Sequence, residues 1–300
     1  MLGIDEIHLS SVPCVLTDVR GKLLFDILPS RKKEAITPYF AEMANKENVR
    51  VVVADMWRPY HDVADQFFPG RLVVVDKFHV VRMANNGLDA VRKKVGRERS
   101  RDQRIRLKDE RFLLYKRRQD LKQYERDRVD EWLKAFPILR QAYQAKERFS
   151  EAYEASNRAE AEHEIARCFQ TMPIEIDPYF KELTTAYGNW KDRILNYFED
   201  RVTNAYTESV NAIIRELDRV GRGYKFETMR AIMLYDETVR TKSTSTRKRR
   251  PTTPDGAFGF FDPFKLDDLD FFEPRKPETR SLDRIATRLA LEPTPEDDED

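Results

Sequence analysis

Three acidic residues stand out, because each falls where a carboxylate would be exposed at the end of a secondary-structure element. Asp5 interrupts an apolar stretch at positions 2–9, Asp55 follows the apolar run 49–54, and Glu208 lies near the start of an amphipathic pattern. Three carboxylates delivered in this way can hold two divalent metal ions. The chemistry that this set predicts is phosphoryl transfer on nucleic acid.

Two metal ions about 3.5–4 Å apart allow one to activate the attacking oxygen and the other to stabilise the leaving oxygen. Hard oxygen ligands favour Mg²⁺ or Mn²⁺ over zinc. We therefore expect two such ions, with the acids acting as ligands.

The elements that would position these acids follow from hydrophobic periodicity. Positions 2–9, 12–19 and 22–28 read as strands of an antiparallel meander, and a helix follows Ser30. The continuous apolar runs 49–54 and 72–75 predict strands that are covered on both faces, with a short helix at 60–68 between them. Three meander strands, helix, strand, helix, strand is the order of a ribonuclease-H-like core. In that order the first and fourth strands are neighbours, so Asp5 and Asp55 face each other.

Helical spacing gives Glu208 a defined face. The polar residues Asn204, Glu208, Asn211 and Arg215 share one side of the pattern, and apolar residues occupy the other side. A carboxylate on a polar stripe opposite a packed stripe is typical of a metal-site helix, and also of any surface helix.

The chain divides by pattern into four segments. We expect residues 1–83 to form the first part of the core, 84–188 a helical insertion, and 189–240 the closing helices that carry Glu208. Residues 241–300 are basic at first, then rich in Pro and Phe, and finally acidic, which predicts a disordered tail. The fold class is α/β, a ribonuclease-H-like mixed sheet with a large all-helical insertion.

Asp76 and His79 form a second constellation directly after the strand 72–75. They are candidates to buttress a metal ligand or to orient a phosphate, and a structural hydrogen bond at the strand end is the alternative. The other histidines, His8, His61 and His163, show no ligand spacing and are expected to be surface or hydrogen-bonded core residues.

The net charge of +1 hides an uneven distribution, since basic residues outnumber acidic ones about two to one over positions 90–130 and the end of the chain is acidic. Basic residues near the helical region and near Glu208 are candidates for phosphate contacts. The candidates for DNA binding are Arg92, Lys93, Lys94, Arg219, Arg222 and Lys225.

The two cysteines, Cys14 and Cys168, lack pairing or metal-ligand spacing and are expected to be small packing residues in a reducing compartment. No apolar run has the roughly twenty residues needed to span a bilayer. We expect a soluble, cytoplasmic protein of the bacterial nucleoid, with no membrane partner.

Several segments together resemble the DDE transposases of bacterial insertion sequences, specifically the ISL3 family. The segments are 2–6 (LGIDE), 55–60 (DMWRPY), 76–80 (DKFHV), and 203–224, which includes Thr203, Asn204, Glu208, Asn211 and the Arg222-Gly223-Tyr224 turn. The resemblance covers roughly residues 1–235.

What the resemblance implies is a ribonuclease-H-like catalytic domain with a helical insertion ahead of the glutamate helix. It assigns Asp5, Asp55 and Glu208 as the metal-binding catalytic triad and Asp76, His79 and Asn211 as accessory residues. The implied activity is DNA cleavage at transposon ends and strand transfer into target DNA, by a homo-oligomer on DNA. Family members usually carry an N-terminal DNA-binding region, and because Asp5 comes so early we expect that region to be missing.

Two other functions remain open. One is a catalytically idle, transposase-derived protein that binds DNA or assists assembly, which the missing end-binding region favours. The other is a ribonuclease-H-like nuclease that cleaves without joining.

Overall fold

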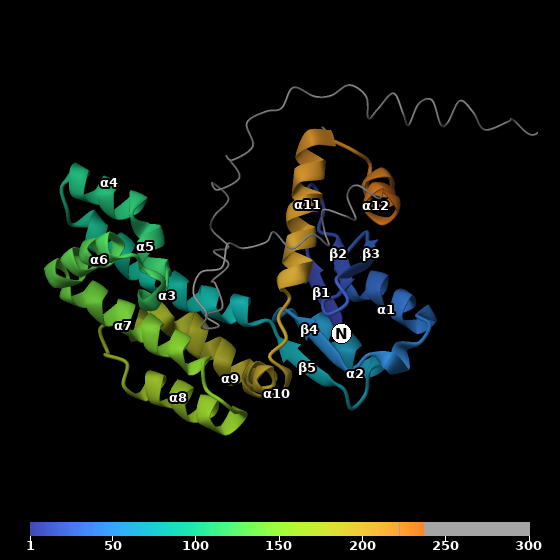
Figure 1. Cartoon of the computed structure of the whole chain (residues 1–300), viewed down its shortest axis with the longest axis horizontal. Coiled ribbons are helices and arrows are strands. Elements are labelled where there is room, and N and C mark those ends of the chain that lie inside the picture. The colour runs from blue at the N-terminus through green and yellow to red at the C-terminus, as the bar shows by residue number, and fades with distance from the viewer. Residues whose placement is uncertain (222, 237–300) are drawn as a thin grey trace, which may run out of the picture. The chain divides into compact units, whose positions relative to one another are not determined.

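The computed structural model describes residues 1–221 and 223–236, and the predicted tail at 241–300 lies outside them. Its centre is a five-stranded mixed sheet in the order β3-β2-β1-β4-β5 (Figure 1). The strands are β1 (Leu2–Glu6), β2 (Cys14–Asp18), β3 (Leu23–Leu28), β4 (Val51–Ala54) and β5 (Leu72–Val75). The first three strands pair antiparallel, whereas β1–β4 and β4–β5 pair parallel. The α/β class and the neighbouring positions of the first and fourth strands are confirmed.

Four helices lie on the two faces of this sheet. They are α1 (Lys33–Glu42), α2 (Arg58–Phe67), α11 (Ala205–Gly221) and α12 (Phe226–Tyr235). Side chains alternate along β1, so that Leu2 and Ile4 join the core under α1 and α2, and Ile7 joins the core under α11 and α12. By the same alternation Gly3 and Asp5 belong to the α11 face.

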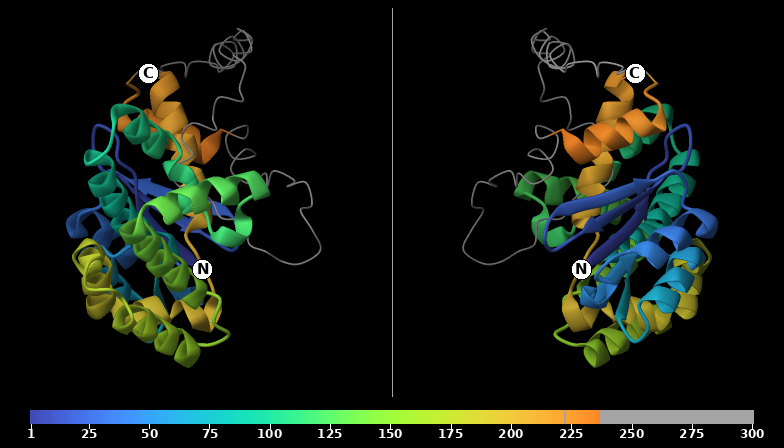
Figure 2. Two further views of the ribbon diagram at one scale, coloured as in Figure 1. Left: turned by 90° about the vertical axis from the view of Figure 1, so that its left-hand side faces the viewer. Right: turned by 90° about the vertical axis from the view of Figure 1, so that its right-hand side faces the viewer.

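The segment between β5 and α11 is helical, as predicted. It contains α3 (Lys77–Arg97), α4 (Arg101–Asp109), α5 (Arg111–Tyr115), α6 (Gln123–Ala135), α7 (Pro137–Ala152), α8 (Arg158–Gln170), α9 (Lys181–Leu195) and α10 (Tyr197–Asp200) (Figure 2). Short 3₁₀ helices occur at Lys46–Asn48, Arg118–Asp120 and Asp177–Phe180. The chain returns to the sheet where Asn196 Nδ2 donates to the Val73 carbonyl at 2.8 Å. The end of this helical segment is therefore tied to the edge strand β5.

Several boundaries differ from the sequence prediction. Strand β1 ends at Glu6 rather than at position 9, because the chain leaves the ladder for the loop that leads into β2. Helix α1 begins at Lys33, in agreement with a helix that follows Ser30, but Ser30 does not cap it and instead accepts a hydrogen bond from the Lys32 amide. Helix α3 begins at Lys77, which places His79 in its first turn. Helix α12 was not predicted.

Both cysteines are buried and unpaired, as expected. Within the ranges that the structure describes, no helix combines the length and the apolar character required to cross a membrane.

Candidate metal centre

Asp5 and Asp55 meet at the carboxyl ends of the paired strands β1 and β4. Ile4 lies opposite Ala54 in the parallel ladder, so the two aspartates are the next residues along each strand. One carboxylate oxygen from each aspartate and one ring nitrogen of His79 all lie within 4.8 Å of one another. The structure thus brings together the two aspartates that the sequence paired, and adds His79.

Asp76 holds His79 in this group without joining it. The backbone amide of Asp76 donates to the Ala54 carbonyl at 2.8 Å, which fixes the strand end beside β4. Its Oδ2 lies 3.4 Å from His79 Nδ1, and its Oδ1 accepts a hydrogen bond from the Asn204 amide at 3.2 Å. Burial opposes protonation of His79, but the Asp76 carboxylate outweighs it and raises the pKa of the imidazole. Of Asp76 and His79, only His79 thus contributes an atom to the group formed with Asp5 and Asp55.

The two aspartates are nearly inaccessible, with 4 % of Asp5 and 7 % of Asp55 exposed. Burial raises the pKa of Asp5 well above its usual value; His79 opposes the rise, and Glu208 and Asp55 add to it. Burial, followed by the charge of Glu6, raises the pKa of Asp55 to about 7. Two buried carboxylates at this separation repel each other, and a cation between them removes that penalty.

Helix α11 is fixed to the sheet by buried polar contacts along one side. Asn204 Nδ2 donates to the Ile4 carbonyl at 3.1 Å, and the Thr207 hydroxyl lies 2.7 Å from that of Thr17. One turn later Asn211 Nδ2 donates to Asp5 Oδ2 at 3.0 Å. Asn211 therefore orients the Asp5 carboxylate.

Glu208 lies on this helix but outside the compact group. Its side chain is 34 % exposed, and its Oε1 accepts a hydrogen bond from Arg215 at 3.2 Å, two turns along. Its charge still contributes, after burial, to the raised pKa of Asp5. The predicted third acid is thus near Asp5 and is paired with a cation from its own helix.

The donor set suits a divalent cation. Two carboxylates and an imidazole converge at one point, where they could ligate a divalent cation. The carboxylate oxygens suit Mg²⁺ or Mn²⁺, whereas an imidazole nitrogen is a ligand preferred by softer transition metals. Beside them, the buried Oδ1 of Asn211 has no hydrogen-bond partner among the residues that the structure describes. A buried acceptor of this kind calls for a donor such as an ion-bound water.

The residues predicted to bind DNA differ in the exposure of their side chains and in the contacts that these make. Arg92 points into the protein, where its side chain is 8 % exposed, pairs with Asp89 and donates to the Leu107 carbonyl. Lys93 is exposed but pairs with Asp89 at 2.8 Å, and Lys94 lies over the Tyr179 ring. Arg92 is thus held in a structural role.

Arg219 and Lys225 are exposed, at the end of α11 and just before α12. Arg222, the remaining candidate, lies outside the described residues.

Sequence reasoning missed two groups next to Asp55. Glu6 accepts hydrogen bonds from Arg31 at 2.9 Å and from the Tyr60 hydroxyl at 3.3 Å, and its charge acts on Asp55. His61 contacts the Asp55 carbonyl oxygen through Nε2 at 2.7 Å. The position of His61 beside the apolar residues of α2 was a signal of burial, but nothing in the sequence indicated its contacts.

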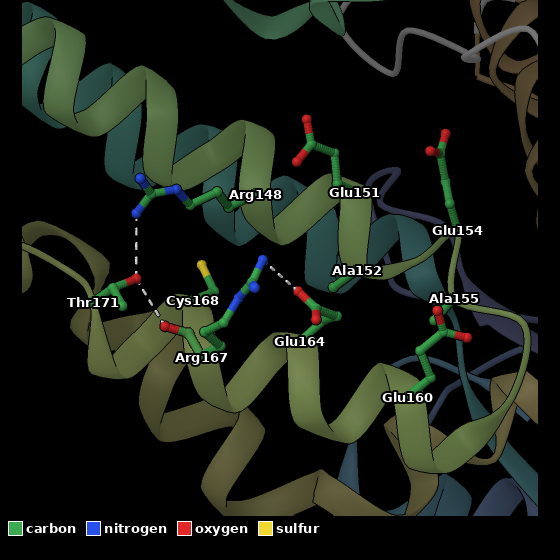
Figure 3. Close-up of a pocket in the computed structure, with 10 residues that line it drawn as sticks. All are labelled: Arg148, Glu151, Ala152, Glu154, Ala155, Glu160, Glu164, Arg167, Cys168 and Thr171. Carbon is green, nitrogen blue, oxygen red and sulfur yellow. Dashed lines mark hydrogen bonds and ion pairs between the residues drawn. The ribbon is translucent and has the colours of Figure 1, made fainter.

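A cavity in the helical segment is separate from these residues. This cavity of about 700 Å³ lies between α7 and α8, lined by acidic and basic side chains and by Cys168 (Figure 3). Arg148 donates to the Thr171 hydroxyl across it, and Arg167 pairs with Glu164. None of the predicted site residues lines this cavity.

Comparison with known proteins identifies the family to which the chain belongs. The DDE transposase family of ISL3 elements, described as "Transposase", matches residues 2–233. The transposase for insertion sequence element IS1557, from two strains of Mycobacterium tuberculosis, is 24 % identical over 257 residues, which cover 75 % of this chain and 56 % of the relative. The chain spans about half the length of these curated relatives. No solved structure gives a significant match. With most of its length matched, the chain belongs to the ISL3 family of DDE transposases.

Proposed function

We propose that this chain is the catalytic domain of a metal-dependent transposase, which cleaves DNA at transposon ends and joins the freed 3′ hydroxyl to target DNA. The observation that carries the proposal is the convergence of Asp5, Asp55 and His79 at the ends of two parallel strands. Family membership supports it. The sheet order and the helices on both faces support a ribonuclease-H-like core. In this proposal 1–83 and 189–240 make up the core and 84–188 is an insertion, with bounds that fall inside α3 and α9.

Asp5, Asp55 and Glu208 would hold two Mg²⁺ or Mn²⁺ ions, with His79 as a neighbouring ligand or counter-charge. When bound, such ions activate the attacking oxygen and stabilise the leaving oxygen of an in-line displacement. Asn211 orients the Asp5 carboxylate, and the Trp57 amide does the same for Asp55 by donating to its Oδ1 at 3.2 Å. Glu208 would exchange its contact with Arg215 for the ions.

DNA would be held by exposed basic side chains near the end of α3 and along α4. This basic surface consists of Lys93, Lys94, Arg97, Arg99, Arg101, Arg104, Arg106 and Lys108. The exposed acids among them are fewer, namely Glu98, Asp102 and Asp109. A surface of this charge favours the phosphate backbone without reading sequence. The partners would be transposon ends and target DNA, bound by a homo-oligomer.

The experiment is a cleavage and strand-transfer assay with Mg²⁺ or Mn²⁺ on duplexes that carry the terminal inverted repeats of the source element. Asp55→Asn removes a ligand charge, and Asp62→Asn, an exposed acid of α2 that pairs with Arg58, is the matched control. We expect joined products from the wild type and from Asp62→Asn, and none from Asp55→Asn.

Two outcomes would favour the other functions. Cleavage without joined products on any of these duplexes would indicate a nuclease. DNA binding without cleavage under either metal would indicate an idle, transposase-derived DNA-binding protein, which the family match does not exclude.

A further inference from the structure

His61 is a buried histidine of α2 whose two ring nitrogens both have partners. It is 1 % exposed. Nε2 lies 2.7 Å from the Asp55 carbonyl oxygen, and Nδ1 lies 2.6 Å from Nη1 of Arg193. Because a guanidinium only donates hydrogen bonds, Nδ1 must be the acceptor and the ring proton must be on Nε2. The ring therefore donates to the Asp55 carbonyl, and burial lowers its pKa to about 4, which agrees with a neutral imidazole.

Arg193 belongs to α9, at the far end of the helical segment, 132 positions from His61. Its second nitrogen, Nη2, donates to Asp65 Oδ2 at 2.6 Å, so one guanidinium contacts α2 at two points. Trp190 has non-helical backbone angles (φ −123°, ψ 15°) inside α9, and its ring lies 4.4 Å from the His61 ring, centroid to centroid. The kink brings Trp190 and Arg193 together around the imidazole.

The bond to the Asp55 carbonyl acts on the carboxylate through the main chain. The Asp55 carbonyl belongs to the peptide unit between Asp55 and Met56, and the amide of the next peptide unit, that of Trp57, donates to Asp55 Oδ1 at 3.2 Å. Rotation of the peptide unit between Asp55 and Met56 would move the Trp57 amide and release the carboxylate from its present direction. A hydrogen bond at the carbonyl restricts this rotation.

We infer that His61 and Arg193 are positioning residues that hold the main chain at Asp55, so that α9 sets the direction of the Asp55 carboxylate at the metal site. This inference rests on the proposed metal-binding role of Asp55. It makes the end of the helical segment part of the support for the site. The alternative is that His61 only fills space beneath Trp190.

The test compares two substitutions of His61 in the full chain. His61→Gln keeps one N–H donor and one oxygen acceptor, whereas His61→Leu fills similar space and has neither. The readout is Mn²⁺ affinity, measured by electron paramagnetic resonance of free Mn²⁺, because it does not depend on DNA or turnover. We expect His61→Leu to bind Mn²⁺ about 10–100-fold more weakly, as for other residues that orient metal ligands, and His61→Gln to recover most of the loss.

A second pair of substitutions tests the inference independently, in case His61→Leu fails to fold. Arg193→Met removes the donor to His61, while Asp65→Asn removes only the charge of the partner at the other guanidinium nitrogen. Both positions reach the surface, with 26 % and 57 % of the side chain exposed. We expect weaker Mn²⁺ binding in Arg193→Met and wild-type affinity in Asp65→Asn.

The outcomes separate the inference from the proposed function. Wild-type Mn²⁺ affinity in both His61→Leu and Arg193→Met would overturn the inference and leave the metal site intact. Equal loss in His61→Gln and His61→Leu, with wild-type affinity in Arg193→Met, would assign His61 to packing. A wild-type protein that binds no Mn²⁺, like an Asp55→Asn control, would remove the metal site and the inference with it.

Discussion

Glu208 differs from the two aspartates in what surrounds its carboxylate. The aspartates are buried against each other, whereas Glu208 is half-exposed and held by Arg215. An exposed ion pair of this kind contributes little to stability, typically about 0–1 kcal/mol. Glu208 therefore contributes little to folding through Arg215, and its carboxylate is available for the proposed role toward metal.

Glu208→Gln should separate these roles. We expect metal-dependent cleavage to fall at least about 100-fold, because a proposed ligand charge is lost. The free energy of unfolding should change by less than about 1 kcal/mol. Glu216→Gln, an exposed acid on the same helix, is the control and should leave both quantities unchanged. Similar cleavage by the two variants would remove Glu208 from the site.

Lys146 gives the helical segment a dependence on pH. It is 1 % exposed; burial lowers the pKa of its ammonium group, and the neighbouring Glu147 opposes this. The folded protein therefore releases this proton at a lower pH than the unfolded chain does. Between the lowered pKa and the usual value of 10.5 the unfolded chain binds more protons, so stability rises with pH in that window.

Urea unfolding of the wild type and of Lys146→Met should reveal this dependence of stability on pH. The free energy of unfolding of the wild type should increase from pH 7 to pH 9.5 relative to that of Lys146→Met. The variant lacks the titrating group, and the other groups cancel in the comparison. Parallel pH profiles for the two proteins would show that burial of Lys146 has no such cost.

The sequence could predict that Asp5 and Asp55 lie close together, but not all of their contacts. Asp5 was found because it interrupts an apolar stretch and Asp55 because it follows one, although the end of β1 was placed too late. His79 was found by its spacing from Asp76, although its place beside the aspartates depended on α3 starting at Lys77. The link from Arg193 to His61 had no local signal, since it joins positions 132 apart.

Helix α11 is set against the sheet by a close approach at Gly3. A Cβ atom there would lie 2.5 Å from Asn204 Oδ1 and 2.6 Å from Thr207 Oγ1, both beside β1. The absence of a side chain allows Asn204 to reach the Ile4 carbonyl. The position of Gly3 therefore determines how closely the helix carrying Glu208 and Asn211 packs on β1.

Gly3→Ala should push the start of α11 away from β1. We expect a loss of about 1–3 kcal/mol in the free energy of unfolding from overpacking, together with weaker Mn²⁺ binding because Asn211 moves from Asp5. Gly188→Ala, in α9 with no atom within 4 Å of its added Cβ, is the control. It should gain up to about 1 kcal/mol from helix propensity. Chemical denaturation measures the free energy of unfolding of both variants. An unchanged free energy of unfolding in Gly3→Ala would contradict the close packing.

The strands and long helices were predictable because their apolar residues repeat with regular periods. The ends of the elements were less predictable, since β1 was expected to run to position 9 and ends at Glu6. Helix α12 escaped prediction although its buried residues Met229 and Met233 are four apart, because it is short and follows a glycine turn. Its place on the sheet depends on a two-point contact from Arg230 to Asp26, which only the fold reveals.

Charge across the chain is nearly balanced, yet exposed basic residues outnumber exposed acidic ones on the surface of α3 and α4. If DNA lies on that surface, affinity must fall with salt according to how many phosphates are neutralised. A nearly neutral protein would then show a strong salt dependence, because only the local charge matters.

Arg101→Ala combined with Arg104→Ala tests this directly. We expect the slope of log affinity against log salt to become shallower by about 1.8, at about 0.9 for each phosphate that is no longer neutralised. Lys134→Ala combined with Arg140→Ala makes the same change in net charge at exposed positions of α6 and α7. Fluorescence anisotropy with a labelled duplex measures the slopes, and identical slopes for the two double variants would argue against the α4 surface.

The hydrogen bonds between α11 and the first two strands join parts of the chain that the ribosome synthesises at different times. Asp5 and Asn211 are 206 positions apart, and Thr17 and Thr207 are 190 apart. A nascent polypeptide has both aspartates before α11, and at a synthesis rate of about 5–20 residues per second the 206 positions from Asp5 to Asn211 take roughly 10–40 s. The proposed nuclease activity would therefore be withheld from the growing chain until α11 has been made.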